Sequence, residues 1–257
     1  APSNLLWPDT THLKYTWIGG YRRARISSQC IKRAIRRHPV FAETTGVDIG
    51  ERTKWMTRPI KQLLIEAGKP EEDARAVAAA FARSYAGKMD GKSDEKTSVL
   101  LYLSRDEISL IVDSLLQNWD DDLQQAQKGN TLKDLVNEII KQTKGRTSAP
   151  DIALFGRMLA DKPELNIDAA VQMAHAISTH RANMEMDYYT AVDDLQQLEQ
   201  DEGAGAGMVG FTSFNSACFY RYARIDWNQL ITNLNGDEEL ARRTVEGFLR
   251  AAVAAVP

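Results

Sequence analysis

Apolar residues recur at helical spacing near the start of the chain, directly after a strongly polar stretch. An apolar stripe within residues 29–37 predicts a helix that begins near Gln29 and takes Ser27 or Ser28 as its cap. The preceding segment, 21–26, alternates basic and other residues imperfectly, as an exposed strand does. The pattern therefore predicts a strand that leads into an amphipathic helix.

The middle of the chain, about 40–148, has the periodicity of a helical subdomain. The segment 88–97 is polar and predicts a loop, and the apolar run 99–103 fits a helix or a strand. Four helices are expected there: from Pro59 to Gly68, from Pro70 to Gly87, behind a capping box at 104–107, and from a Thr131 cap to Gly145.

The last hundred residues return to a mixed pattern. The glycine run at 203–207 is too flexible for a packed core, so 182–214 is expected to form a hairpin-like projection. The other elements expected are a buried strand at 152–154, a helix at 166–179, a strand at 216–226 and a long amphipathic helix at 237–256.

Composition places the chain among ordinary globular proteins. It has 257 residues, 43% of them hydrophobic and 26% charged, and a net charge of −3. No apolar run approaches the ~20 residues of a membrane span, so no membrane association is expected. Two sparse cysteines, Cys30 and Cys218, fit free thiols in a reducing cytoplasm.

Charge is segregated along this slightly acidic chain. Residues 19–37 hold seven basic residues and no acidic one, whereas acidic residues gather at 104–138 and 193–202. A local basic surface and a helix N-terminus together favour the binding of a phosphodiester backbone. The alternative is a solvated basic helix with no ligand. The expected contacts are Lys14, Arg22, Arg23, Arg25, Ser27, Gln29, Lys32, Arg33 and Arg36.

Candidates for catalysis are few. His175 and His180 are five residues apart, which does not place them on one helical face, and we interpret them as a packed helix histidine and a helix-end histidine. The pair Asp193–Asp194 could bind Mg²⁺ for phosphodiester cleavage, but adjacent carboxylates are more often solvated. The glycine run lacks the Lys-Ser/Thr of a phosphate-binding loop. We expect no catalytic residue, no metal and no cofactor.

The stretch 219–222 has the aromatic character of a strand in an RNA-recognition sheet. As a strand it would place Tyr220 and Tyr222 on one face and Phe219 and Arg221 on the other. We favour the interpretation in which a half-buried strand packs its aromatic side chains inward.

The basic segment also carries a resemblance to a known family. GGYRRARISSQCIKRA at 19–34 resembles the signature of the CasC family, the repeated backbone subunit of the type I-E CRISPR Cascade complex. Four later blocks are similar to the family in the same order: DIALFGRM at 151–158, AHAISTH at 174–180, YTAVDDL at 189–195 and FNSACFYRYA at 214–223.

The resemblance implies an α+β fold with a ferredoxin-like, RNA-recognition-type palm, a helical insertion and a protruding thumb. It implies a non-catalytic subunit that binds CRISPR RNA and holds the guide for pairing with target DNA, among other copies of itself and other Cascade subunits. In the family, the thumb and one palm residue displace a guide nucleotide at regular intervals; the matching residues are Met158, Tyr189, Thr190, Val192 and Val209. The expected domains are palm at 1–39, 149–181 and 215–257, helical insertion at 40–148 and thumb at 182–214.

The chain also departs from the family. Residues 6–9 read LWPD where members carry Asn-Arg-Asp-Asp, and a strand before Pro2 and a portion after Pro257 are missing, so we expect a sequence truncated at both ends. Two other functions stay open. One is a metal-dependent ribonuclease using Asp193 or Asp194, since relatives in other CRISPR types cut RNA with a thumb aspartate. The other is a helical protein-interaction module with an incidental basic helix.

Overall fold

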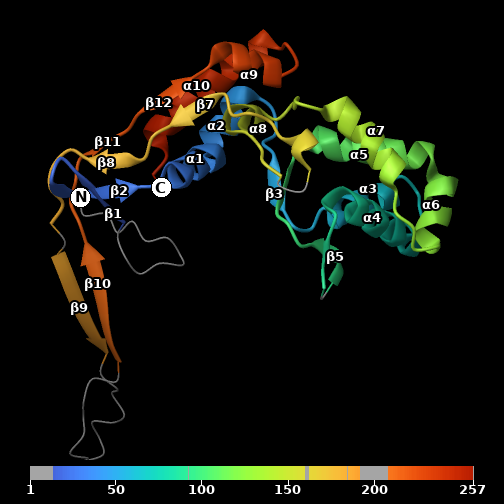
Figure 1. The fold of residues 1–257 in the computed structure, drawn as a ribbon, viewed down its shortest axis with the longest axis horizontal. Coiled ribbons are helices and arrows are strands. Elements are labelled where there is room, and N and C mark those ends of the chain that lie inside the picture. Colours follow the sequence, from blue (N-terminus) through green and yellow to red (C-terminus); the bar gives the residue numbers. More distant parts are fainter. Residues whose placement is uncertain (1–13, 92, 160–161, 184, 192–207, 257) are drawn as a thin grey trace, which may run out of the picture. The chain divides into compact units, whose positions relative to one another are not determined.

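The computed structural model describes residues 14–91, 93–159, 162–183, 185–191 and 208–256. Within these ranges the protein is a mixed α/β structure with small, mostly antiparallel sheets (Figure 1). The chain divides into two compact units. Unit 1 comprises Ala1–Ala34, Met173–Ala223 and Val256–Pro257, and unit 2 comprises Ile35–Gln172 and Arg224–Ala255. No helix of the described ranges combines the length and apolar character that a membrane crossing requires.

Unit 1 contains a four-stranded antiparallel sheet. Two glycines with positive φ, Gly19 at 63° and Gly20 at 80°, form the tight turn between its first two strands. Helix α1, Ser28–Arg37, begins directly after the second strand, which confirms the predicted strand-to-helix segment. The strand order is β1 (Tyr15–Ile18), β2 (Tyr21–Ile26), β8 (Ala176–Ser178) and β11 (Phe219–Tyr220).

Unit 1 also holds a separate two-stranded ribbon. Strands β9, Glu185–Ala191, and β10, Met208–Phe214, pair antiparallel over seven residues each (Figure 1). This confirms the paired arms of the projection expected at 182–214, while its glycine run at 203–207 lies outside the described residues.

The helix expected at 166–179 is wrong, because this segment contains strands. They are β7, Val171–Met173, which pairs with β12, Ala223–Ile225, and β8, which lies between β2 and β11. Exposure alternates along β8, with both Ala176 and Ser178 buried. Pairing with two neighbouring strands thus outweighs a spacing that also fits a helix.

Unit 2 is mostly helical, as the periodicity of 40–148 predicts. Its main core joins side chains of the helices from α3 to α7, and α10 packs on α2. Two antiparallel strand pairs complete it: β3 (Glu51–Thr53) with β6 (Leu101–Leu103), and β4 (Met89–Asp90) with β5 (Ser93–Thr97) in the segment expected as a loop. The helices are α2 Pro39–Thr45, α3 Thr57–Glu66, α4 Glu71–Ala86, α5 Arg105–Gln117, α6 Trp119–Gln127, α7 Lys133–Thr143, α8 Pro150–Phe155, the 3₁₀ turn η1 Pro163–Leu165, α9 Trp227–Asn233 and α10 Glu238–Ala254.

Of the two helix caps predicted from the sequence within residues 40–148, the structure contains one. The predicted capping box is confirmed: the Glu107 amide donates to Ser104 Oγ (3.0 Å), and the Ser104 amide donates to the Glu107 carboxylate (2.8 Å). The predicted Thr131 cap is wrong, because α7 has Leu132 at its N-cap with no side-chain bond. The Leu132 amide instead donates to Ser84 Oγ of α4 (2.8 Å).

The strand expected at 152–154 is also wrong. These residues are fully buried in helix α8, which starts with Pro150 in its first turn. A short apolar run fits a buried strand or a buried helix equally well, and here the proline and the Thr147 side chain, which accepts from the Ala149 amide (3.1 Å), favour a helix.

Candidate nucleic-acid interface

The β1–β2 hairpin separates its three arginines onto two faces. Arg22 stands opposite Trp17, and its guanidinium lies 3.8 Å from the ring centroid of Tyr15. Arg23 and Arg25 lie on the other face because side chains alternate along a strand. The Arg23 guanidinium donates to the backbone oxygen of Ser178 (2.9 Å), so part of its hydrogen-bonding capacity serves the sheet.

Lys14 extends the β1–β2 ladder by one residue. Its backbone oxygen accepts from the Arg25 amide (2.9 Å), which places the two residues opposite each other. The Lys14 side chain is exposed and that of Arg25 is half-buried. Both residues are predicted from the sequence to contact phosphates, and the structure places them on the same face of the β1–β2 hairpin.

Side chains already occupy part of the α1 N-terminus. Ser27 Oγ accepts from the Cys30 amide (3.2 Å), which confirms Ser27 as the cap. The Ser28 amide donates to Nδ1 of His175 (2.9 Å). Two of the backbone amides that could have bound an anion, those of Ser28 and Cys30, therefore already have acceptors. Gln29, which lies between them in the sequence, is exposed.

Helix α1 presents a smaller basic face than its sequence indicates. Lys32 is half-buried and Arg33 is exposed, as expected of surface cations. The third expected member, Arg36, is only 7% exposed, so its assignment to the RNA-binding face is wrong.

Arg36 belongs instead to a buried polar network of unit 2. Its guanidinium donates to the Gly50 backbone oxygen (2.9 Å) and lies 3.4 Å from the Asp151 carboxylate. The Tyr102 hydroxyl and the Gly50 amide also donate to this carboxylate. Arg36 thus neutralises a buried acid and is not available to a ligand.

Burial dominates the electrostatics of this network. It raises the pKa of Asp151, against the opposing effects of the Gly50 amide, the Tyr102 hydroxyl and the Arg36 guanidinium. It also raises the pKa of the Tyr102 hydroxyl, and the neighbouring Asp151 carboxylate adds to that shift. A carboxylate that accepts three hydrogen bonds at this depth has a structural role.

The block that contains Met158 has one buried and one exposed side chain. Arg157 is 4% exposed, and one of its terminal nitrogens lies 2.7 and 2.9 Å from the two carboxylate oxygens of Glu107. The next residue, Met158, is 84% exposed. Arg157 therefore anchors the backbone on which the expected RNA-contacting methionine is presented.

The β9–β10 ribbon places the expected thumb residues on both of its faces. The Tyr189 ring covers Gly210, where a Cβ would overlap the ring. Thr190 stands opposite Val209 in the ladder. Its side chain lies on the face away from Tyr189, together with Tyr188 of the same strand and Phe211 of the paired strand.

Sequence reasoning missed the aromatic pair on this ribbon. Tyr188 and Phe211 stand opposite each other in register, their ring centroids are 6.5 Å apart, and each is 67% exposed. Strand alternation around Tyr189 could have identified Tyr188 as the residue that shares a face with Thr190.

Several sequence-based predictions lie outside the described residues. They are the contact expected at Val192, the acidic pair Asp193–Asp194, the glycine run and the departure at residues 6–9.

The inward packing expected for the aromatic residues of 219–222 is wrong for both tyrosines. Tyr220 is 63% exposed and Tyr222 is 53% exposed, while Phe219 is half-buried. Strand β11 consists of Phe219 and Tyr220, whose side chains point to opposite faces of the sheet. Phe219 lies on the packed face and Tyr220 on the exposed face.

Neither of the two histidines considered for catalysis, His175 and His180, lies in a helix. His175 is exposed, lies between β7 and β8 and caps α1, so its assignment to a packed helix position is wrong. Cys30 and Cys218 are not joined in a disulfide. Across the described part of the chain, no group of three or more His, Cys, Asp or Glu side chains is arranged to hold a metal ion.

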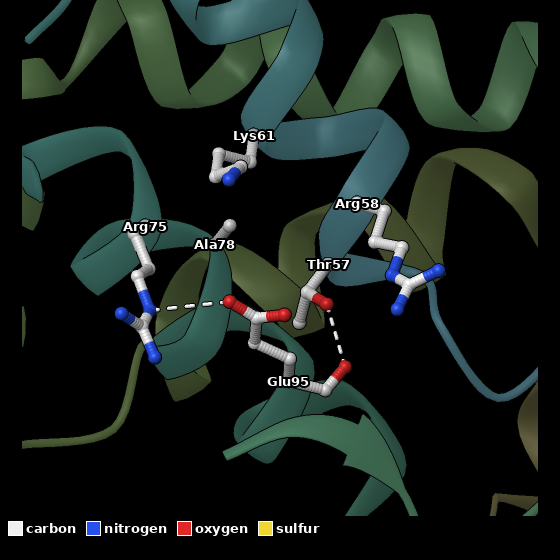
Figure 2. Close-up of a pocket in the computed structure, with 6 residues that line it drawn as sticks. All are labelled: Thr57, Arg58, Lys61, Arg75, Ala78 and Glu95. Atoms are coloured by element: carbon white, nitrogen blue, oxygen red, sulfur yellow. Dashed lines mark hydrogen bonds and ion pairs between the residues drawn. The ribbon is translucent and has the colours of Figure 1, made fainter. Parts of the chain in front are cut away.

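A pocket of unit 2 gathers cations that the sequence analysis did not single out (Figure 2). Arg75 pairs with Glu95 (3.2 Å), Lys61 pairs with Glu71 (3.2 Å), and Arg58 lies 3.9 Å from the Trp55 ring centroid. Each cation therefore has a partner within the fold, which weakens the case for an anion site. The lining residues are Thr57, Arg58, Lys61, Arg75, Ala78 and Glu95.

The whole chain, residues 1–257, matches the model of the CT1975-like protein family. It belongs to this family. The CT1975-like chain is also similar to a chain of a solved "CRISPR RNA-guided surveillance complex, pre-nicking". The two are 32% identical with a TM-score of 0.81, over 100% of this chain and 70% of that one.

A second solved chain, from a "CRISPR RNA-guided surveillance complex", is 28% identical with a TM-score of 0.70, over 99% of this CT1975-like chain and 69% of that one. No curated protein matches the sequence.

Proposed function

We propose that this CT1975-like protein is the repeated guide-binding subunit of a CRISPR surveillance complex of the Cascade type, and specifically a CasC subunit of type I-E. The similarity to a surveillance-complex chain, at 32% identity and a TM-score of 0.81 over 70% of that chain, carries the proposal. The sequence blocks at 19–34 and 189–195 support the finer assignment.

In this proposal the protein reads the backbone of CRISPR RNA, and base pairing reads the sequence of target DNA. Lys32, Arg33 and Gln29 contact phosphates, and the hairpin arginines lie on the same unit. Neighbouring copies and other Cascade subunits complete the assembly in the cytoplasm. The four-stranded sheet with α1 forms the ferredoxin-like palm, most of unit 2 is the helical insertion, and the β9–β10 ribbon is the thumb.

Binding to RNA over a range of salt concentrations tests this function. The proposal requires that affinity for single-stranded RNA falls as salt rises, because phosphate contacts release counterions. A chain that binds no RNA at low salt, or binds it with no salt dependence, would instead be a protein-interaction module.

We further propose that the protein does not hydrolyse RNA. Guide RNA and a matching RNA incubated with the protein and Mg²⁺ or Mn²⁺ should both stay intact on a denaturing gel. The informative control is Asp193→Ala: cleavage by the wild type that disappears in this variant would establish the ribonuclease instead.

The ribbon is proposed to act as a wedge that displaces guide nucleotides. Its exposed aromatic and apolar side chains, Tyr188, Tyr189 and Phe211 among them, can replace the neighbours of an unstacked base. Chemical probing of the assembled complex should reveal hyper-reactive guide nucleotides at a regular period.

Shortening the thumb across residues 200–209 should abolish that period. A uniform pattern of reactivity in the wild-type complex, or a pattern that survives the shortening, would rule out the wedge.

A further inference from the structure

We infer that the open face of the β1-β2-β8-β11 sheet binds one base of single-stranded RNA, with the Tyr220 ring as the stacking platform and Arg25 two strands away in the same row. This inference rests on the proposed function. It adds a site that contacts a base to an RNA-binding surface that so far consists of phosphate contacts.

The strand register places these residues in one row. Arg25 of β2 stands opposite Ile177 of β8, and Ile177 stands opposite Tyr220 of β11. Residues opposite each other in an antiparallel ladder share a face. The hydrogen bond from the Arg25 amide to the Lys14 oxygen extends the row to the other edge of the sheet.

Burial shows which face of the sheet is open. The neighbouring row contains Ala24 and Ser178, which are 2% and 1% exposed, so this side is packed. The row that contains Tyr220 faces the other way, and Tyr220 is 63% exposed. A large aromatic side chain with this exposure at a sheet surface offers a flat platform to a ligand.

Charge decides what the ligand is. None of the four strands contains Asp or Glu, whereas β2 places two arginines, Arg23 and Arg25, on the face that carries Tyr220. Nε of Arg25 is buried without a hydrogen-bond partner among the described residues. Cations on the same sheet face as an exposed ring match a stacked base and the phosphate that follows it, as on sheets that recognise single-stranded RNA. An acidic protein partner would use the cations but has no need of the ring.

The test compares Tyr220 variants of the full chain on single-stranded oligoadenylate across several salt concentrations. Tyr220→Ala should weaken binding about tenfold at every salt concentration and leave the slope of log affinity against log salt unchanged, because stacking releases no counterion. Tyr220→Phe, which keeps the ring, should bind as the wild type does. Tyr222→Ala, a matched exposed tyrosine outside the strand, should also leave affinity unchanged.

Three results would overturn the inference: wild-type affinity in Tyr220→Ala, a tenfold loss in Tyr220→Phe, or an equal loss in Tyr222→Ala. If Tyr220→Ala does not fold, Tyr220→Leu serves the same comparison, with bulk but no aromatic ring. A wild-type chain that binds no oligoadenylate would instead contradict the proposed function, whereas binding that needs Lys32 and Arg33 but not Tyr220 would contradict the inference alone.

Discussion

Asp151→Ala is expected to lower the free energy of unfolding by about 3–5 kcal/mol, since it leaves the Arg36 guanidinium buried without its counter-charge. The Tyr102 hydroxyl and the Gly50 amide lose their acceptor in the same variant. Chemical denaturation followed by circular dichroism measures the change.

The matched control is Asp48→Ala. Asp48 pairs with Arg105 at 2.8 Å, but both side chains are more than half exposed, so its loss should cost no more than about 1 kcal/mol. Equal effects of the two substitutions would contradict the structural role of the buried network. Arg36→Met should also destabilise the fold, yet leave the salt dependence of RNA binding by the folded protein unchanged.

Replacing Lys32 and Arg33 together by Ala is expected to weaken binding to guide RNA by about 10²- to 10⁴-fold, since each substitution removes a charge-assisted hydrogen bond of roughly 1.5–3 kcal/mol. The slope of log affinity against log salt should decrease by about 1.4, or ~0.7 for each phosphate of a single strand that the protein no longer neutralises. Fluorescence anisotropy with guides of different sequence measures both quantities, and affinity should fall equally for every guide.

A double variant of Arg242 and Arg250 is the control for this pair. Both lie exposed on α10 and pair with glutamates one turn away, so their removal changes the net charge equally without touching α1. If the Lys32/Arg33 variant keeps the wild-type slope, or discriminates between guides, α1 does not bind the RNA backbone.

The sequence predicted the elements whose signals are local. The glycine turn, the Ser27 cap and the box at Ser104 each depend on residues within a few positions, and all three are present. The same holds for the helical character of 40–148, where apolar periodicity extends over whole helices.

Features that depend on distant partners were not predictable in this way. Arg36 has the spacing of an exposed cation, but its partner Asp151 is 115 residues away in sequence. The strand at Ala176–Ser178 and the outward direction of Tyr220 depend on pairing between β2, β8 and β11, which join segments far apart along the chain. Periodicity within one segment carries no information about such neighbours.

The central claim is that this chain binds CRISPR RNA as part of a surveillance complex. Its most direct test is to purify the protein from a cell that expresses a CRISPR array and to sequence the RNA that accompanies it. We expect RNA of uniform length in which spacer sequence is joined to repeat sequence, together with other subunits of the complex. Recovery of the protein without RNA, or with cellular RNA in proportion to its abundance, would contradict it.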